Sequence, residues 1–350
     1  MASSPPTSPL SGTSATTATT AMLRARLEAV LQGAPDLNLS GLTFDSDGQV
    51  DLLCDVCASA SGTLRTVNLA RCVFPRPDAV GASLAGALRE CLSIVRLELF
   101  SVGLDDAGAV ALADALTDTL VAHHSLQVLG LGHNRIGDAG MVALCGALVC
   151  SSRIQTFGIE HNAFAAEGAI AVAGLIAHSR SLHTCWLSGN NIGQAGAGAL
   201  AVAVSRSPLL ATLDVSACGL GDPATEQMAA FAVAKSAALT HLELRANNIG
   251  DAGVMELARA LATSPKLGTL GLADNAVTDA SAGAIARAIA VSRTLRELDL
   301  SGNRLTDAAS PALAAAVARS PALRALFLRG NAMSETAMHS VRRALDARAA

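Results

Sequence analysis

Residues 126–136 read Leu-Gln-Val-Leu-Gly-Leu-Gly-His-Asn-Arg-Ile, and this frame decides the fold. Its pattern is Leu-x-x-Leu-x-Leu-x-x-Asn-x-Ile. The alternation of Leu129 and Leu131 predicts a short strand with one buried face. At the ninth position, Asn134 turns inward, where its amide is expected to bond loop backbone groups that would otherwise lack partners.

The frame recurs through most of the chain. Successive clear copies start 28 or 29 residues apart, and looser copies precede them, which gives eleven units in total. The clear copies begin at Leu126, Ile154, Leu182, Leu210, Leu239, Leu267, Leu295 and Leu323, and the looser ones at Ala34, Leu64 and Ile94. Self-similarity at such a period predicts a repeat architecture in which each unit packs on its neighbours.

A helix is expected after the frame in each unit. The motif Gly-Asp-x-Gly comes first, as at 137–140 and 250–253, and its Asp is expected to cap the helix that follows. The helix is rich in Ala with Leu at helical spacing, as in residues 139–149, so helices of successive units can pack side by side. Position four of the frame is predicted to form one buried column of Leu129, Phe157, Cys185, Leu213, Leu242, Leu270, Leu298 and Leu326.

In these motifs the chain resembles the ribonuclease-inhibitor-like subclass of leucine-rich-repeat proteins, as found in the sensor arms of NOD-like receptors and in Ran GTPase-activating proteins. The resemblance covers about residues 34–350. It implies an α/β fold, a right-handed solenoid or horseshoe of about eleven β-α units. Parallel strands would line the concave face, and helices would lie outside.

Three segments are expected along the chain. Residues 1–21 are rich in Ser, Thr, Pro and Ala and are predicted to be a disordered tail. Residues 22–33 are predicted to form an N-terminal capping helix, and residues 34–350 the repeat domain, with the last unit, 323–350, acting as the C-terminal cap. The apolar residues expected on one face of the capping helix are Leu23, Leu27, Val30 and Leu31.

The composition limits the partner and the compartment. The net charge of −4 gives no attraction to phosphate backbones or anionic lipids, so neither nucleic acid nor membrane is the expected partner. Eight cysteines at irregular spacing, with no signal-peptide pattern, favour reduced thiols in the cytoplasm. An organellar transit peptide in residues 1–21 is the alternative, because no acidic residue precedes Glu28.

The sequence lacks the common catalytic motifs. Its two lysines, Lys235 and Lys266, lie outside any Gly-Lys-Ser/Thr phosphate loop. Neither His-Glu-x-x-His nor Gly-x-Ser-x-Gly occurs. We therefore expect no catalytic residue, no cofactor and no bound metal.

Three patterns resemble metal sites, but each has a simpler structural interpretation. Residues 45–48 resemble part of a calcium loop that lacks its acidic twelfth ligand. Cys54 and Cys57 have the spacing of a metal clip, but no second pair follows, so they are interpreted as buried small side chains. His133 and His161 occupy the same position in adjacent units, so we expect loop histidines about 5 Å apart.

The frame positions that packing leaves free carry the functional prediction. Positions three, five and seven point into the concave face. Trp186, the only Trp, lies midway along position five, and an exposed aromatic surrounded by charge is typical of a binding hot spot. The alternative is that Trp186 is a neutral substitution lying over Gly130 and Gly158. The expected partner-binding residues are Glu98, Phe100, Glu160, Trp186, Asp214, Glu243, Arg245, Asp299 and Phe327.

These observations predict a non-enzymatic scaffold whose mildly acidic concave face binds a protein partner with a basic patch. One alternative is a GTPase activator resembling the Ran-directed family, with Arg71, Asn134 and Arg135 as candidate residues. The long acidic tail of that family has no counterpart after Asp346 in this sequence. The other alternative is the detached sensor arm of a NOD-like receptor.

Overall fold

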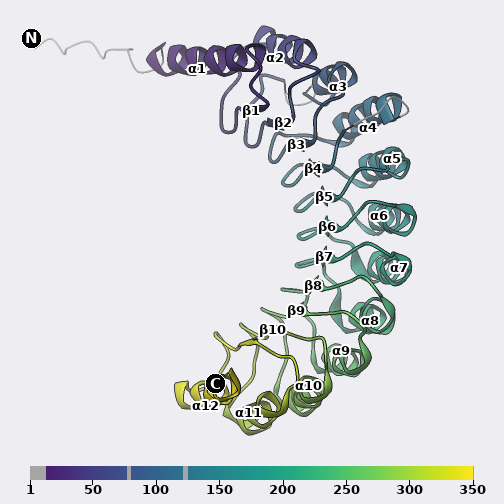
Figure 1. Cartoon of the computed structure of the whole chain (residues 1–350), viewed down its shortest axis with the longest axis vertical. Coiled ribbons are helices and arrows are strands. Elements are labelled where there is room, and N and C mark those ends of the chain that lie inside the picture. Colours follow the sequence, from purple (N-terminus) through teal and green to yellow (C-terminus); the bar gives the residue numbers. More distant parts are fainter. Residues whose placement is uncertain (1–12, 77–79, 121–124, 350) are drawn as a thin grey trace, which may run out of the picture.

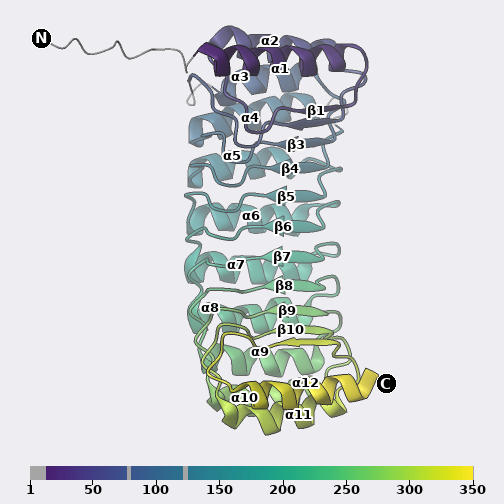
Figure 2. The same cartoon turned by 90° about the vertical axis from the view of Figure 1, so that its left-hand side faces the viewer.

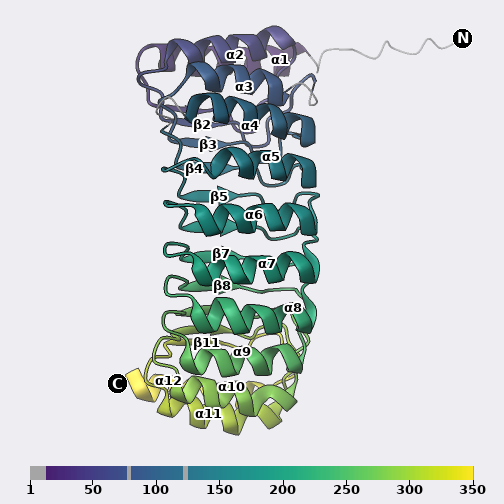
Figure 3. The same ribbon diagram turned by 90° about the vertical axis from the view of Figure 1, so that its right-hand side faces the viewer.

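The computed structural model describes residues 13–76, 80–120 and 125–349, which form one curved solenoid (Figure 1). In this part of the chain, eleven short strands form a single sheet in which consecutive strands pair in parallel. Figure 1 shows the strands on the concave side of the curve and the helices on the convex side, and Figures 2 and 3 view these two faces. The predicted α/β solenoid is confirmed.

The elements alternate regularly along the chain. The strands are β1 (Asp36–Asn38), β2 (Thr66–Asn68), β3 (Arg96–Glu98), β4 (Val128–Gly130), β5 (Thr156–Gly158), β6 (Thr184–Trp186), β7 (Thr212–Asp214), β8 (His241–Glu243), β9 (Thr269–Gly271), β10 (Glu297–Asp299) and β11 (Ala325–Phe327). The helices are α1 (Thr13–Leu31), α2 (Asp47–Ser59), α3 (Val80–Glu90), α4 (Asp106–Leu120), α5 (Asp138–Leu148), α6 (Ala166–His178), α7 (Gly193–Arg206), α8 (Gly221–Gln227), α9 (Asp251–Thr263), α10 (Asp279–Val291), α11 (Ser310–Arg319) and α12 (Glu335–Ala349). None of these described helices is long and apolar enough to cross a membrane.

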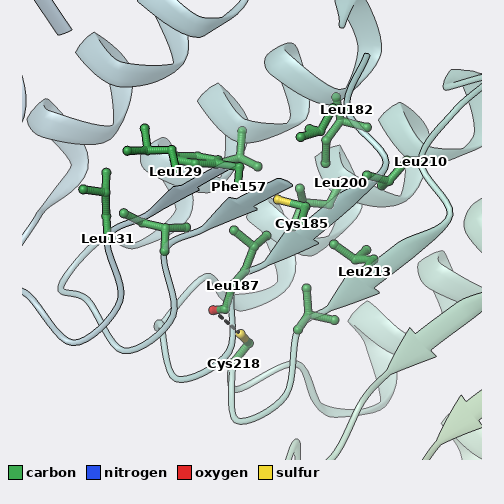
Figure 4. Packing of buried hydrophobic residues seen from close by; sticks show 14 of the residues in the cluster. Leu129, Leu131, Phe157, Leu182, Cys185, Leu187, Leu200, Leu210, Leu213 and Cys218 are labelled. Atoms are coloured by element: carbon green, nitrogen blue, oxygen red, sulfur yellow. Dashed lines mark hydrogen bonds between the residues drawn. The ribbon is translucent and has the colours of Figure 1, made fainter. Parts of the chain in front are cut away.

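Position four forms a buried column between the sheet and the helices. Leu129 pairs in register with Phe157, then Cys185 and Leu213, and Figure 4 shows these side chains along successive strands. Each is at most 1% exposed. The column is buried as predicted as far as β10. The prediction is wrong for Leu326 of β11, which is only half-buried because no further strand of the described chain packs beyond it.

The Asn at position nine joins each unit to the one before it. Asn190 is 1% exposed, and its Oδ1 accepts a hydrogen bond from the Asn162 N–H at 3.0 Å. Its Nδ2 donates to the Leu187 carbonyl of its own unit at 2.8 Å and to the Ile159 carbonyl of the preceding unit at 3.0 Å. The predicted bonds to loop backbone groups are present, and the one between units runs backward because the preceding position-six carbonyl lies beside this turn.

The same backward bond recurs along the solenoid. Cysteines take the place of Asn in two units, where the thiol donates to the equivalent carbonyl, and Figure 4 shows the bond from Cys218 to Leu187. The donors are Cys72, Asn134, Asn162, Asn190, Cys218, Asn247, Asn275, Asn303 and Asn331. We call this set the asparagine row.

The Asp of the Gly-Asp-x-Gly motif caps the helix of the next unit, not its own helix as predicted. Asp138 Oδ1 accepts from the N–H groups of Ala165 and Gly168, the N-cap and third residue of α6, at 2.7 and 2.8 Å. The N-cap of its own helix is Gly137, which has no side chain to cap α5, and the Gly137 N–H donates to Asp106 of the preceding unit at 2.7 Å. A carboxylate at the neighbouring helix N-terminus is favoured by the helix dipole. The aspartates that bond forward in this way, the aspartate row, are Asp106, Asp138, Asp222, Asp251, Asp279 and Asp307.

Between Asp138 and Asp222, two successive units lack this Asp because Ala166 and Gln194 occupy its position. The next helices begin at Gly193 and Gly221, whose φ angles are +58° and +62°. By contrast, the Gly137 N–H donates a hydrogen bond to Asp106, and the backbone of Gly137 is extended, with φ −94°. Glycine adopts a left-handed conformation without a steric penalty. A change of backbone therefore accompanies the missing cap.

A row of buried serines, which our prediction missed, closes the turn from helix to strand in every unit from α5 onward. Ser179 Oγ accepts from the Leu182 N–H at 3.1 Å. Its sequence signature is a Ser three residues before the frame Leu or Ile of each unit from Ile154 onward. The members of this serine row are Ser151, Ser179, Ser207, Ser236, Ser264, Ser292 and Ser320.

The 29-residue unit that begins at Leu210 carries its extra residue in the helix. There the chain forms a π-helix, Met228–Val233, directly after α8. A π-helical turn absorbs a single inserted residue without breaking the helix. Leu213 therefore still pairs in register with Leu242.

The N-terminal helix α1 is longer than predicted. It begins at Thr13 instead of Met22, because the Ala-containing residues 13–21, which we assigned to the tail, continue the helix. Residues 1–12 of the predicted tail lie outside the described residues. The helix buries Leu23, Leu27 and Val30, whereas Leu31, predicted on the same face, is exposed.

Replacing Asn190 by Ala is expected to lower the free energy of unfolding by at least about 1–3 kcal/mol, because buried backbone groups lose their partners. The matched control is Asn191→Ala, since Asn191 is exposed and lies outside the asparagine row. Urea unfolding followed by circular dichroism measures both. Equal stability of the two variants would contradict the assignment of the row.

Replacing Asp138 by Ala is expected to speed amide hydrogen exchange at Ala165 and Gly168 and to cost about 0.5–2 kcal/mol, the usual value of a lost helix cap. Gly137 and Gly140 are internal controls, because Asp106 holds their N–H groups at 2.7 and 2.9 Å. Faster exchange confined to these two glycines would show that Asp138 acts on its own helix.

Candidate partner-binding surface

The strands line the concave face (Figure 2), and the side chains at frame positions three, five and seven build its surface. The register places Gly158 of β5 beside Trp186 of β6, and Trp186 beside Asp214 of β7. Neighbouring strands lie about 4.8 Å apart, so side chains at equal positions contact one another. Five half-buried carboxylates, which we call the acidic row, follow this face: Glu98, Glu160, Asp214, Glu243 and Asp299.

The nine predicted binding residues do not form one patch. Trp186 is 42% exposed and lies within the acidic row, between Glu160 and Asp214. Phe327 is 44% exposed but lies on β11, at the far end of the sheet. Phe100 belongs to a stack of rings on the rim. The structure therefore groups Trp186 with the acidic row and leaves both phenylalanines apart.

Glycines let the acidic side chains lie across a neighbouring strand. A Cβ atom added at Gly271 would overlap the Glu243 carboxylate, and any other residue there would displace it. The pairs of this kind are Glu98 with Gly130, Glu160 with Gly132 and Glu243 with Gly271. The glycines at free frame positions thus set the orientation of the acids.

Trp186 and Glu160 meet over Gly158. A Cβ atom at Gly158 would lie 3.2 Å from Trp186 Cε3 and 3.1 Å from Glu160 Oε2. Within the described residues, Oε2 is buried and has no hydrogen-bond partner. Burial raises the pKa of Glu160 above its usual range, and the charges of Glu98 and Asp214 add to this effect. A hydrogen bond to the backbone of Glu160 itself and the neighbouring His161 oppose it. Trp186 does lie over glycine, as the alternative interpretation expected, yet much of its ring remains exposed.

Glu243 is the most strongly perturbed carboxyl of the row. Its pKa is raised to about 7, chiefly by burial and then by the neighbouring charges of Asp214, Asp299 and Glu297, while Arg245 opposes the shift. Glu297, at position three of its strand, is a contributor that the sequence analysis missed. A group with this pKa changes its charge near neutral pH.

Two of the basic residues on this face are already paired. Arg96 lies 3.1 Å from a Glu98 carboxylate oxygen, and Arg245 lies 2.6 Å from Asp274. Arg245, a predicted partner contact, thus has an intramolecular partner, which the analysis of positions three, five and seven missed because Asp274 is at position eight. From β4 to β7, positions three, five and seven carry no Lys or Arg. This part of the acidic row has no counter-charge on the sheet.

The turns after the strands form a rim beside this face. All eleven residues at position eight have a left-handed backbone, with φ between 51° and 75°. Along the rim, Arg71 Cζ lies 5.6 Å from the ring centroid of Phe100, which is 4.5 Å from that of His133. The His133 and His161 centroids are 4.2 Å apart, close to the predicted spacing, and the two imidazoles are tilted by 33° to each other. Among the described residues, no three His, Cys, Asp or Glu side chains form a group that could hold a metal ion.

The other metal-like patterns are engaged within the fold. Burial raises the pKa of Cys54 to about 11 and that of Cys57 to about 12, so both stay protonated near neutral pH. Cys54 donates a hydrogen bond to the Ser83 carbonyl at 3.3 Å. Asp47, from the calcium-like stretch, pairs with Arg76 at 2.9 Å.

The residues considered for GTPase activation also contact the scaffold. Asn134 Oδ1 accepts from the backbone N–H groups of residues 102–104, at 3.0–3.1 Å. Arg71 lies over Phe100, and Arg135 donates to a carbonyl of the preceding unit at 3.2 Å. Asn134 therefore has a structural role in the asparagine row.

A family model described as a leucine-rich repeat matches residues 122–145, 235–258 and 291–309, three segments of the described pattern of strand, turn and helix. The chain is a leucine-rich-repeat protein. No curated protein sequence matches it.

Solved structures share the architecture of this leucine-rich-repeat protein. An internalin, InlF of Listeria monocytogenes, is 16% identical over 93% of this chain and 92% of its own, with a TM-score of 0.50. The structure of a TLR13–ssRNA13 complex is 17% identical over 86% of this chain and 36% of its own, also with a TM-score of 0.50. The tropomodulin C-terminal domain of Caenorhabditis elegans is 18% identical over 39% of this chain and 83% of its own, with a TM-score of 0.33. At these identities the likeness concerns the fold alone.

Replacing Glu243 by Gln is expected to stabilise the protein at pH 8, with a smaller effect at pH 5. The raised pKa means that folding takes up a proton between pH 4.5 and about 7, so stability due to this group falls as the pH rises through that window. Because the group is partly exposed, we expect only about 1 kcal/mol at pH 8. Thermal unfolding at both pH values measures it, with Glu226→Gln on exposed helix surface as control. Loss of stability in Glu243→Gln at pH 8 would contradict the assignment.

Proposed function

We propose that this chain is a non-enzymatic scaffold whose concave face binds a protein partner carrying a basic patch. One observation carries the proposal: Glu160, Asp214, Glu243 and Asp299 line this face beside the exposed Trp186, with no Lys or Arg at the face positions of β4 to β7. Charge of one sign steers a partner of opposite sign and fixes its register. An exposed Trp supplies the apolar contact typical of hot spots.

The scaffold suits this role because its binding face is formed before a partner arrives. The asparagine and serine rows fix the turns on both sides of β5 to β11, so little ordering is required on association. Leucine-rich-repeat and other solenoid folds generally serve as binding scaffolds through their concave surfaces. The TLR13 complex contains single-stranded RNA. For this chain, the acidic row disfavours a phosphate backbone, so a basic protein is the better match.

The cysteines support a reducing compartment, and we propose the cytoplasm. All eight are free thiols, and seven are buried or half-buried. Disulfides are rare in reducing compartments, where such buried thiols persist as small hydrophobic side chains.

Affinity purification from the native cell tests the binding face. The baits are the wild type, Trp186→Ala, Glu243→Lys and the control Glu226→Lys, which reverses a charge on the exposed surface of α8. We expect a set of proteins retained by wild type and control but weakened by about 30-fold or more in both concave variants, the usual effect of losing a hot spot. Circular dichroism confirms that each bait is folded. Interactors that are the same for all four baits would refute the proposal.

A further inference from the structure

A groove of about 770 Å³ crosses the outer surface of α9, α10 and α11, which pack side by side on the convex face (Figure 3). Alanines of all three helices and Gly283 line its floor. Val291, which is 54% exposed, and half-buried Met255 add larger apolar side chains. The outer face of such a helix is ordinarily polar. An apolar groove at this place is therefore a candidate docking surface.

The charged side chains that line this groove are all positive. Arg259, Arg287 and Arg319, one from each helix, are exposed, and no Asp or Glu is among the lining residues. Arg259 pairs with Glu256 of its own helix. Arg287 and Arg319 form no ion pair with any residue that the structure describes. Two guanidinium groups thus stand at an apolar groove without a counter-charge.

The remaining acidic residues of these helices are engaged at the helix N-termini. Asp251 and Asp279 belong to the aspartate row and accept from backbone N–H groups of the following units, each at 2.9 Å. In the turns after α9 and α10, at the opposite end of the helices, the exposed Lys266 and Arg293 add positive charge. The field at the groove is therefore positive, although the whole chain carries a net charge of −4.

The small floor residues bring the arginine head groups close to the surface of the groove. Arg287 Nη1 lies 3.7 Å from the point where a Cβ atom of Gly283 would stand, so this side chain folds back over the glycine. Arg319 Nε donates to the Ala315 carbonyl of its own helix at 3.1 Å. A guanidinium has five N–H donors, so most of those on Arg287 and Arg319 stay free for an acceptor from outside.

We propose that this groove binds an amphipathic helix of a partner protein, whose apolar face lies on the alanine floor and Val291 while its Asp or Glu side chains pair with Arg287 and Arg319. Small residues let two helices approach closely, and a helix laid in a groove is a common mode of peptide recognition. Carboxylates match the forked donors of arginine in strong, charge-assisted hydrogen bonds. This second surface lies on the opposite side of the solenoid from the concave face and would take a separate partner.

Other negatively charged partners fit this groove less well. Single-stranded nucleic acid is bound through aromatic side chains that stack on its bases, and no aromatic residue lines the groove. A phosphate backbone also gains nothing from an apolar floor. An anionic lipid surface is flat on the scale of three helices, so it does not enter a groove between them. A helix supplies both the apolar ridge and the carboxylates.

Fluorescence anisotropy of labelled synthetic helices of about four turns tests the groove on the full chain. The acidic probe carries Leu at every third or fourth position and Glu on both flanks of that stripe. One control probe has Gln in place of each Glu, and another has the acidic composition in scrambled order. A side-chain cross-link keeps each probe helical. We expect saturable binding of the acidic probe, at least about tenfold tighter than either control at low salt. High salt should reduce this preference.

Matched variants assign the binding to the groove. The double variant Arg287→Glu, Arg319→Glu should weaken the acidic probe at least about tenfold, because it places like charges at the contact. Val291→Ser should weaken it about fivefold through the loss of apolar contact. The control is Arg153→Glu, which reverses the charge of an exposed arginine in the turn after α5, outside the groove, and should leave the affinity unchanged. Thermal unfolding verifies that each variant is folded.

Three outcomes would overturn the assignment of this groove. If the wild type binds no probe saturably, or binds the Glu and Gln probes equally, the groove does not recognise an acidic helix. If Arg153→Glu weakens binding as much as the double variant, the effect is one of overall charge. If oligothymidylate or phosphatidylserine vesicles bind through Arg287 and Arg319 while the acidic helix does not, the arginines serve phosphate groups. No measurement here involves the concave face, so affinity purification judges the proposed function separately.

Discussion

The backbone N–H and C=O groups in the turns between repeats are buried, so side chains of the repeats must form hydrogen bonds with them. Asparagine reaches backward to the carbonyl of the preceding strand, aspartate reaches forward to the next helix N-terminus, and serine closes the turn within its own unit. Every internal repeat therefore depends on both neighbours. The regular curvature of the solenoid and of its concave sheet follows from this mutual dependence.

The repeat frame was sufficient to predict the strands, their order and the buried column, because a fixed period leaves one way to stack equal units. It was insufficient for the direction of the bonds. A Gly-Asp motif before a helix looks the same in sequence whether Asp138 caps α5 or the adjacent helix α6. Only the spacing between units decides which N–H groups its carboxylate reaches. The start of α1 was also missed, because residues 13–21 show no apolar periodicity from which a helix could be predicted.

The candidate site was likewise predictable only in part. The frame indicated which residues point into the concave face, but not what each contacts there. Arg245 has a partner in Asp274 from the adjacent turn, and the ring of Phe100 lies beside that of His133. Trp186 and Glu160 both approach Gly158, where the absence of a side chain leaves room for them. Such arrangements arise from side-chain conformations that a linear pattern does not specify.

The left-handed rim has a consequence for how such a protein can diverge. A branched β-carbon is strongly disfavoured at φ values of 51–75°, and none of the eleven position-eight residues is Val, Ile or Thr. The neighbouring face positions carry no such restriction. After duplication of a repeat, new recognition is thus free to arise on the sheet by single substitutions, while the rim is confined to a short list of residue types. The turns at position eight are therefore expected to vary less in residue type than the face of the sheet beside them.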